Sequence, residues 1–222
     1  YPNSDIRRIM NGVVVEPATV DCRARDRREI RAACGVGDDE WLLLQIGHNF
    51  KLKGVRHLIE AAGLMSRGDD PPVRVVVVGR GDPSPLRKLA SRLGIGENVR
   101  FTGPIDGVAA YYHAADVLVH PTYYDPCSRV VLEAVARGLP AITTRFDGAS
   151  EILTDRSRGL VIESPDRITE LAQCIRSIVD ERGSEPGRMN GDPEAVSMAG
   201  HVEEVCRLYR SLSERGRPAR SR

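Results

Sequence analysis

The sequence predicts an α/β protein built on a Rossmann-like, doubly wound parallel sheet. Short runs rich in Val, Ile and Leu, bounded by Gly, Pro or polar residues, alternate with longer stretches of helical spacing. Uninterrupted apolar runs are typical of strands buried on both faces, and their alternation with helices indicates a parallel sheet. With 222 residues, of which 41% are hydrophobic and 28% charged, the chain is long enough for one large domain.

The expected strands and helices follow one another along the chain. Strands are expected at residues 41–47, 73–78, 116–120 and 140–144. Helices, with apolar residues recurring at three- and four-residue spacing, are expected at residues 54–67, 83–93, 128–137 and 167–181. Asp82 is the expected N-cap of the second helix, with Pro83 in its first turn.

Two stretches outside this alternation divide the chain into three parts. Residues 1–40 hold a charged helix at 25–34, and residues 41–182 form the predicted sheet domain. Residues 183–222 begin with a linker rich in Gly, Pro and charge and end in a basic tail. Between them we expect an amphipathic helix, with one apolar stripe formed by Val202, Val205, Leu208, Tyr209 and Leu212.

Composition argues against several classes of protein. The 32 basic and 31 acidic residues leave a net charge of +1, so no overall field attracts nucleic acid or an anionic membrane. The five cysteines are scattered, which favours neither a disulfide framework nor a structural zinc site. The apolar runs are far shorter than the ~20 residues of a membrane span, and the first residues do not resemble a signal peptide. We expect a cytoplasmic protein that contacts the inner face of the membrane at most peripherally.

Ligands bind beyond the carboxyl ends of the strands in such a sheet, so the loops that follow the strands are the candidate site. The first loop is Gly47-His48-Asn49-Phe50-Lys51-Leu52-Lys53-Gly54. Glycines, a basic side chain and a following helix N-terminus together suit a phosphate. A surface turn with solvated lysines explains this loop equally well. Gly79-Arg80-Gly81-Asp82, after the second strand, follows the same logic but is too short to be specific.

The loop after the third strand carries a pair of carboxylates. Asp125 lies in the loop and Glu133 in the following helix, with seven residues between them. Ser128 and Arg129 fall where the first free N–H groups of that helix would point at an anion. This layout suits a phosphate ligand with hydroxyls on both sides, such as a nucleotide sugar. Spacing alone favours a simpler interpretation, in which Asp125 caps a turn and Glu133 is an ordinary helix residue.

A longer motif surrounds this pair. It reads Asp125-Pro-Cys-Ser-Arg-Val-Val-Leu-Glu133, continues through Ala-Val-Ala-Arg-Gly-Leu-Pro, and ends at Gly148-Ala-Ser-Glu151. The motif resembles the signature of the group 1 (family-four) retaining glycosyltransferases. The stretches Asn11–Val13, Lys53–Gly54, Val78–Gly81, Val99–Gly103 and Ala115–Val117 also fall in family order. The resemblance covers residues 8–212, and some of its loops resemble members that act on lipopolysaccharide core sugars.

The resemblance implies a GT-B architecture, in which two Rossmann-like domains face a cleft and the C-terminal domain holds the sugar donor. Residues 1–40 would be the crossover from the other domain. Lys53 would contact the donor diphosphate, Glu133 the ribose hydroxyls, and Asp125, the catalytic candidate, the transferred sugar. The remaining residues implied to bind substrate are Gly47, His48, Arg80, Ser128, Arg129 and Val130.

Three departures from the family pattern stand out. Asp125 replaces a Glu, which shortens the side chain by one methylene, and His48 replaces an Arg. The acceptor domain, which usually supplies a catalytic His, is expected in a longer precursor or on a partner chain. The histidines at positions 57, 113 and 201 are interpreted as structural.

The resemblance therefore implies transfer of a sugar from a nucleotide-sugar donor to a glycan or glycolipid acceptor. UDP is the favoured nucleotide, with GDP and ADP as alternatives, and neither a metal nor a cofactor is expected. A non-catalytic nucleotide-sugar-binding module is the main alternative function. A nucleotide-sugar epimerase is a third, which the carboxylate pair disfavours because those enzymes lack it.

Overall fold

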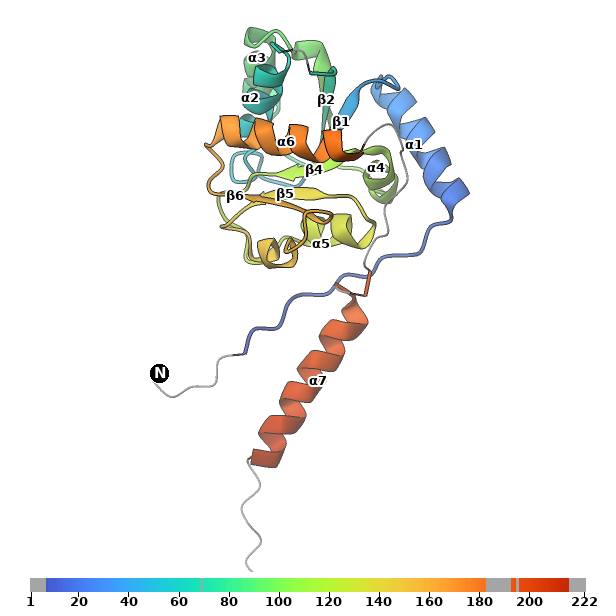
Figure 1. The fold of residues 1–222 in the computed structure, drawn as a ribbon, viewed down its shortest axis with the longest axis vertical. Coiled ribbons are helices and arrows are strands. Elements are labelled where there is room, and N and C mark those ends of the chain that lie inside the picture. The colour runs from blue at the N-terminus through green and yellow to red at the C-terminus, as the bar shows by residue number, and fades with distance from the viewer. Residues whose placement is uncertain (1–6, 69, 183–192, 195, 216–222) are drawn as a thin grey trace, which may run out of the picture.

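The computed structural model describes residues 7–68, 70–182, 193–194 and 196–215 (Figure 1). Its six strands form one parallel sheet in the order β3-β2-β1-β4-β5-β6. The strands are β1 (Trp41–Ile46), β2 (Val73–Val78), β3 (Val99–Gly103), β4 (Val117–His120), β5 (Ala141–Thr144) and β6 (Gly159–Ile162). This is the strand order of a Rossmann fold. The predicted fold class is confirmed.

Helices cover both faces of the sheet. Among the described residues, the six helices that do so are α1 (Val20–Cys34), α2 (Val55–Met65), α3 (Ser84–Arg92), α4 (Ala109–Ala114), α5 (Arg129–Ala136) and α6 (Ile168–Arg182), and a further helix, α7 (Met198–Arg215), follows them. Buried residues of α2, α3 and α6 belong to one apolar cluster, and those of α1, α4 and α5 belong to a second. Alternate residues of a strand join opposite clusters: Leu43 packs in the first, whereas Leu42 and Leu44 pack in the second.

The predicted elements agree with the structure to within one or two residues, except for α1. That helix begins at Val20, where the Thr19 hydroxyl accepts from the Cys22 N–H as an N-cap. Arg27 and Arg31 of α1 both form ion pairs with Asp116, at the start of β4. The helix in residues 1–40 is therefore part of the layer that covers the sheet. β3, β6 and α4 were not predicted as elements, because all three are short and carry little periodicity.

The last helix stands apart from the sheet, and α7 points away from the other elements in Figure 1. Its first turn pairs with the N-terminal segment, since the Met198 N–H donates to the Val13 carbonyl and the Val13 N–H donates to Val196. A Cβ at Gly12 would lie 2.6 Å from the Met198 Cα, so this close approach requires glycine. The predicted linker, apart from Pro193, and the basic tail beyond Arg215 lie outside the described residues.

The predicted apolar stripe of α7 is largely exposed. Tyr209 is 70% exposed, Leu212 53% and Val202 50%. Among the described helices, none is both long and apolar enough to cross a lipid bilayer.

Candidate functional site

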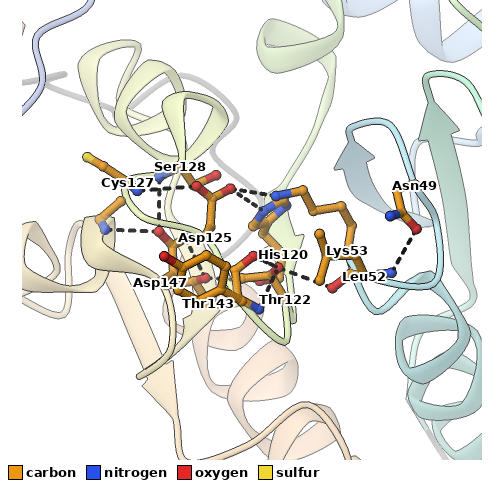
Figure 2. A network of polar contacts seen from close by, with 12 residues as sticks. Asn49, Leu52, Lys53, His120, Thr122, Asp125, Cys127, Ser128, Thr143 and Asp147 are labelled. Carbon is orange, nitrogen blue, oxygen red and sulfur yellow. Dashed lines mark hydrogen bonds and ion pairs between the residues drawn. The ribbon is translucent and has the colours of Figure 1, made fainter.

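The candidate site lies where the strand order reverses. β1 and β4 are neighbours, but β1 connects outward to β2 on one side and β4 connects to β5 on the other. The loops that leave their carboxyl ends therefore diverge, and open sheets bind ligands in the crevice between such loops. Figure 2 shows the side chains that these two loops direct toward each other.

The two loops are joined closely by their backbones. The Leu52 carbonyl, in the loop after β1, accepts from the Tyr123 N–H and the Thr122 hydroxyl, in the loop after β4. Gly54 begins α2 with a φ of 66°, and a Cβ there would lie 2.0 Å from the Pro121 carbonyl oxygen. Glycine at this position thus allows the close approach that brings Lys53 to the far loop.

Lys53 and Asp125 form an ion pair across the crevice. The Lys53 Nζ lies 2.6 Å from the Asp125 Oδ2, and the two side chains are only 17% and 16% exposed. Burial of the Asp125 carboxyl acts to raise its pKa, but His120 and Lys53 outweigh burial and hold that pKa well below the usual range. Asp125 is therefore ionised at neutral pH, and its charge faces an ammonium that a phosphate could also bind.

The start of α5 is fixed by Asp147, which follows β5. One Asp147 oxygen accepts from the Ser128 N–H at 3.0 Å and the Ala149 N–H at 2.9 Å, and the other accepts from the Thr143 hydroxyl at 2.8 Å. The Ser128 amide is thus engaged within the protein. The amides of Arg129 and Val130 come next, and first-turn N–H groups have no acceptor within their own helix.

Glu133 lies in α5, where Tyr112 of α4 holds its carboxylate. The Tyr112 hydroxyl donates to the Glu133 Oε2 at 3.0 Å, and the Arg129 guanidinium lies 3.6 Å from Oε1. Burial and the adjacent Glu133 carboxylate raise the pKa of Tyr112 well above its usual value, so the phenol stays protonated and remains a donor. The Tyr112 hydroxyl and the Arg129 guanidinium thus hold the Glu133 carboxylate in one orientation.

Gly47 borders Lys53, and His48 contacts Arg80. The His48 Nδ1 accepts from the Arg80 N–H at 3.0 Å, which ties the loop after β1 to the loop after β2. A Cβ at Gly47 would lie 3.3 Å from the Lys53 Cγ, so this glycine borders the lysine side chain. The Arg80 side chain is exposed. That these three residues bind substrate stays a prediction.

His120 and Gln45, like Asp147 and Tyr112, were not predicted as site residues from the sequence. His120, the last residue of β4, is 1% exposed, and its Nε2 lies 3.7 Å from the Asp125 Oδ2. The Gln45 amide nitrogen, in β1, lies 3.3 Å from the His120 Nδ1. The sequence signal that could have identified His120 and Gln45 is a polar residue near the carboxyl end of each of two apolar strands.

The histidines interpreted as structural make contacts within the protein. His57 lies between Glu60 and Tyr123, His113 contacts Asp26, and His201 contacts the Met10 carbonyl. Across the part of the chain that the structure describes, no three His, Cys, Asp or Glu side chains cluster as metal ligands would.

Comparison with known proteins now identifies the family. The family described as "Glycosyl transferases group 1" matches residues 26–190, most of the chain and all of the crevice. The chain belongs to this family. The resemblance stated from the motif around Asp125 and Glu133 is therefore confirmed.

Individual relatives of this group 1 glycosyltransferase have related names. Lipopolysaccharide glucosyltransferase WaaG of Escherichia coli K12 is 34% identical over 155 residues, which cover 69% of this chain and 41% of WaaG. D-inositol 3-phosphate glycosyltransferase 1 of Catenulispora acidiphila is 33% identical over 212 residues, which cover 88% of this chain and 50% of that protein. The chain spans half or less of the length of these two curated relatives.

Solved structures agree on the fold. The crystal structure of WaaG superposes with a TM-score of 0.68 at 30% identity, covering 79% of this chain and 48% of WaaG. HepE of Anabaena, solved in complex with UDP-glucose, superposes with a TM-score of 0.71 at 21% identity, covering 84% of this chain and 53% of HepE.

Proposed function

We propose that this chain is the donor-binding domain of a retaining glycosyltransferase that uses a nucleoside-diphosphate sugar, with UDP-sugar favoured. The observation that carries the proposal is the partly buried Lys53–Asp125 pair, 2.6 Å apart, at the point where the strand order reverses. A cation and an ionised carboxylate at this crevice would serve the two halves of such a donor, its diphosphate and its sugar.

Each side of the donor has a candidate partner. Lys53 and the free amides of Arg129 and Val130 would hold the diphosphate, because ammonium groups and helix N-termini both favour anions. When the bond between the anomeric carbon and the phosphate oxygen breaks, the electron pair leaves on the diphosphate. The same groups would then stabilise the added negative charge, so no metal is required. Asp125 would face the sugar that is transferred.

Glu133 would bind the ribose hydroxyls of the nucleotide. Its carboxylate is held by the Tyr112 hydroxyl, which leaves acceptor capacity for two hydroxyl donors. The choice of UDP is supported by HepE, which shares the fold and was solved with UDP-glucose. WaaG, named a glucosyltransferase, supports a glucosyl or related hexosyl donor.

The acceptor in this proposal is a glycan or glycolipid, held by an acceptor domain in a longer precursor or on a partner chain. The exposed apolar side chains of α7, Tyr209 and Leu212 among them, would pack against that domain. Transfer would take place in the cytoplasm, at most in peripheral contact with the inner face of the membrane. The part of residues 1–40 that precedes α1 would provide the crossover between the two domains.

Calorimetric titration of the 222-residue chain tests the proposal. UDP, GDP and ADP, with their glucose or mannose conjugates, are titrated separately, and we expect micromolar binding of UDP and its conjugate. Glu133→Ala should weaken UDP binding by roughly 1–3 kcal/mol, the cost of losing a charged hydrogen-bond partner. If a folded chain binds none of these nucleotides, it is not a self-sufficient donor domain and the proposal fails.

A further inference from the structure

His120 is a buried side chain that lies beside the Lys53–Asp125 pair but has no part in the proposed donor contacts. Its Nε2 is one of three buried side-chain nitrogen or oxygen atoms, among the residues described, that have no hydrogen-bond partner. A buried polar group without a partner destabilises the folded state, so a folded protein rarely keeps one without a reason. Figure 2 shows the His120 ring directed at the Asp125 carboxylate, and the Nε2–Oδ2 distance is 3.7 Å.

Gln45 determines which ring nitrogen of His120 carries the proton. The Gln45 amide nitrogen lies 3.4 Å from the Lys53 carbonyl oxygen and 3.3 Å from the His120 Nδ1. The Lys53 carbonyl oxygen can only accept, which favours the amide nitrogen on this side and leaves the Gln45 Oε1 buried without a partner. The His120 Nδ1 then accepts from the same nitrogen, which places the ring proton on Nε2. The N–H of His120 therefore points at Asp125.

A bound diphosphate would compete with Asp125 for Lys53. Both are anions, and the repulsion between anions a few ångströms apart is strong in a site shielded from water. Because the Lys53 side chain is long and flexible, its ammonium would move from Asp125 to the diphosphate, and the two anions would lie further apart. Asp125, 16% exposed, would then lose the cation that now lies 2.6 Å from its Oδ2.

We propose that His120, with its proton set by Gln45, is a positioning residue that takes over the Asp125 carboxylate when a diphosphate draws Lys53 away. From 3.7 Å, the His120 Nε2 needs to approach the Asp125 Oδ2 by only about 0.8 Å to reach an ordinary hydrogen-bond length. Asp125 would stay ionised and oriented toward the sugar while Lys53 binds phosphate. The inference rests on the proposed function, because it assumes that the crevice receives a diphosphate.

A ligand-free experiment tests the central step. Lys53→Met removes the ammonium, as a diphosphate would, and the side-chain N–H signals of His120 are followed by ¹⁵N NMR. His120→Gln identifies the signal among the five histidines. We expect the Nε2-protonated form in the unchanged chain, and a downfield shift of its proton in Lys53→Met as the hydrogen bond to Asp125 forms. Adding Asp125→Ala should reverse that shift.

A proton on Nδ1, or a signal that Lys53→Met leaves unmoved, would overturn the inference. Because no nucleotide is present, this result is independent of whether the chain binds UDP, so it cannot be confused with failure of the proposed function.

A second experiment separates positioning from structural support. In His120→Leu, Asp125 would retain Lys53, so UDP affinity should fall about tenfold, the size expected for one hydrogen bond to a charged group, whereas uridine affinity should not change. His120→Gln, which keeps an N–H donor, should recover most of the loss. In an Asp125→Asn background, His120→Leu should change UDP affinity by less than about twofold. Equal losses in both backgrounds, in folded variants, would show a purely structural role and reject the inference.

Discussion

The crevice between β1 and β4 and the helix α7 differ most in whether their side chains have partners within the chain. In the crevice, charged groups are partly buried and paired with one another, as Lys53 is with Asp125. On α7, apolar side chains such as Tyr209 and Leu212 are mostly exposed. The comparison indicates that the crevice is organised by the chain's own residues, whereas the apolar surface of α7 contributes nothing to it.

Removing the buried acceptor Asp147 should have the largest effect. Asp147→Ala would leave the Ser128 and Ala149 amides without their acceptor and the Thr143 hydroxyl with only the His120 carbonyl, so we expect the free energy of unfolding to fall by about 3 kcal/mol. Urea denaturation measures this loss.

Asp155 offers a matched control for that experiment. It accepts from the Ser157 N–H at 2.8 Å in an exposed turn, so Asp155→Ala should cost much less. Similar losses in the two variants would show that burial does not distinguish the crevice from an ordinary surface turn.

Removing the cation of the crevice should have the next largest effect. Lys53→Met should weaken UDP binding by about 2 kcal/mol, roughly 30-fold, because an ion pair with phosphate is lost. Uridine, which carries no phosphate, should bind as before. Lys51→Met, two positions away on an exposed side chain of the same loop, provides the control and should leave UDP affinity unchanged. If both variants weaken UDP binding equally, Lys53 contributes only as a surface charge and does not contact the phosphate.

The sequence predicted the sheet well because its strands are buried on both faces. Val73–Val78 is apolar apart from Arg74, so its limits coincide with those of the observed strand. Short elements were missed for the opposite reason: α4 has six residues, too few to show a period. Thr19 could have located the start of α1, but a single capping residue is a weak signal without its hydrogen bond.

For the site, the sequence located the loops but not the contacts between them. Lys53 and Asp125 were each singled out, yet their ion pair depends on how closely Gly54 approaches Pro121, a distance set by tertiary packing. Asp147 and His120 were missed for the same reason. Asp147 acts on Ser128 in a different loop, and His120 reaches Asp125 only through the way the loop after β4 folds back, so neither lies at a spacing that marks it as functional.

A smaller effect is expected from the residue that holds Glu133. Tyr112→Phe removes the hydrogen bond to the Glu133 Oε2 but keeps the ring, so nucleotide affinity should fall by about 1 kcal/mol, roughly fivefold. Because Glu133 is proposed to bind ribose, UDP and uridine should lose the same factor, unlike in Lys53→Met. Tyr111→Phe, at the preceding residue, is the control. Unchanged uridine affinity in Tyr112→Phe would mean that this hydrogen bond does not set the orientation of Glu133.

The smallest effect is expected from substitutions on α7, which test whether this helix is independent of the crevice. The double variant Tyr209→Ser, Leu212→Ser replaces two exposed apolar side chains, so the free energy of unfolding should change by no more than about 0.5 kcal/mol for each substitution. UDP affinity should be unchanged, because neither residue belongs to the loops that form the crevice. A loss of UDP affinity in the isolated chain would show that α7 supports the donor site directly. If affinity holds but sugar transfer fails when an acceptor domain is supplied, the exposed stripe serves that domain, as proposed.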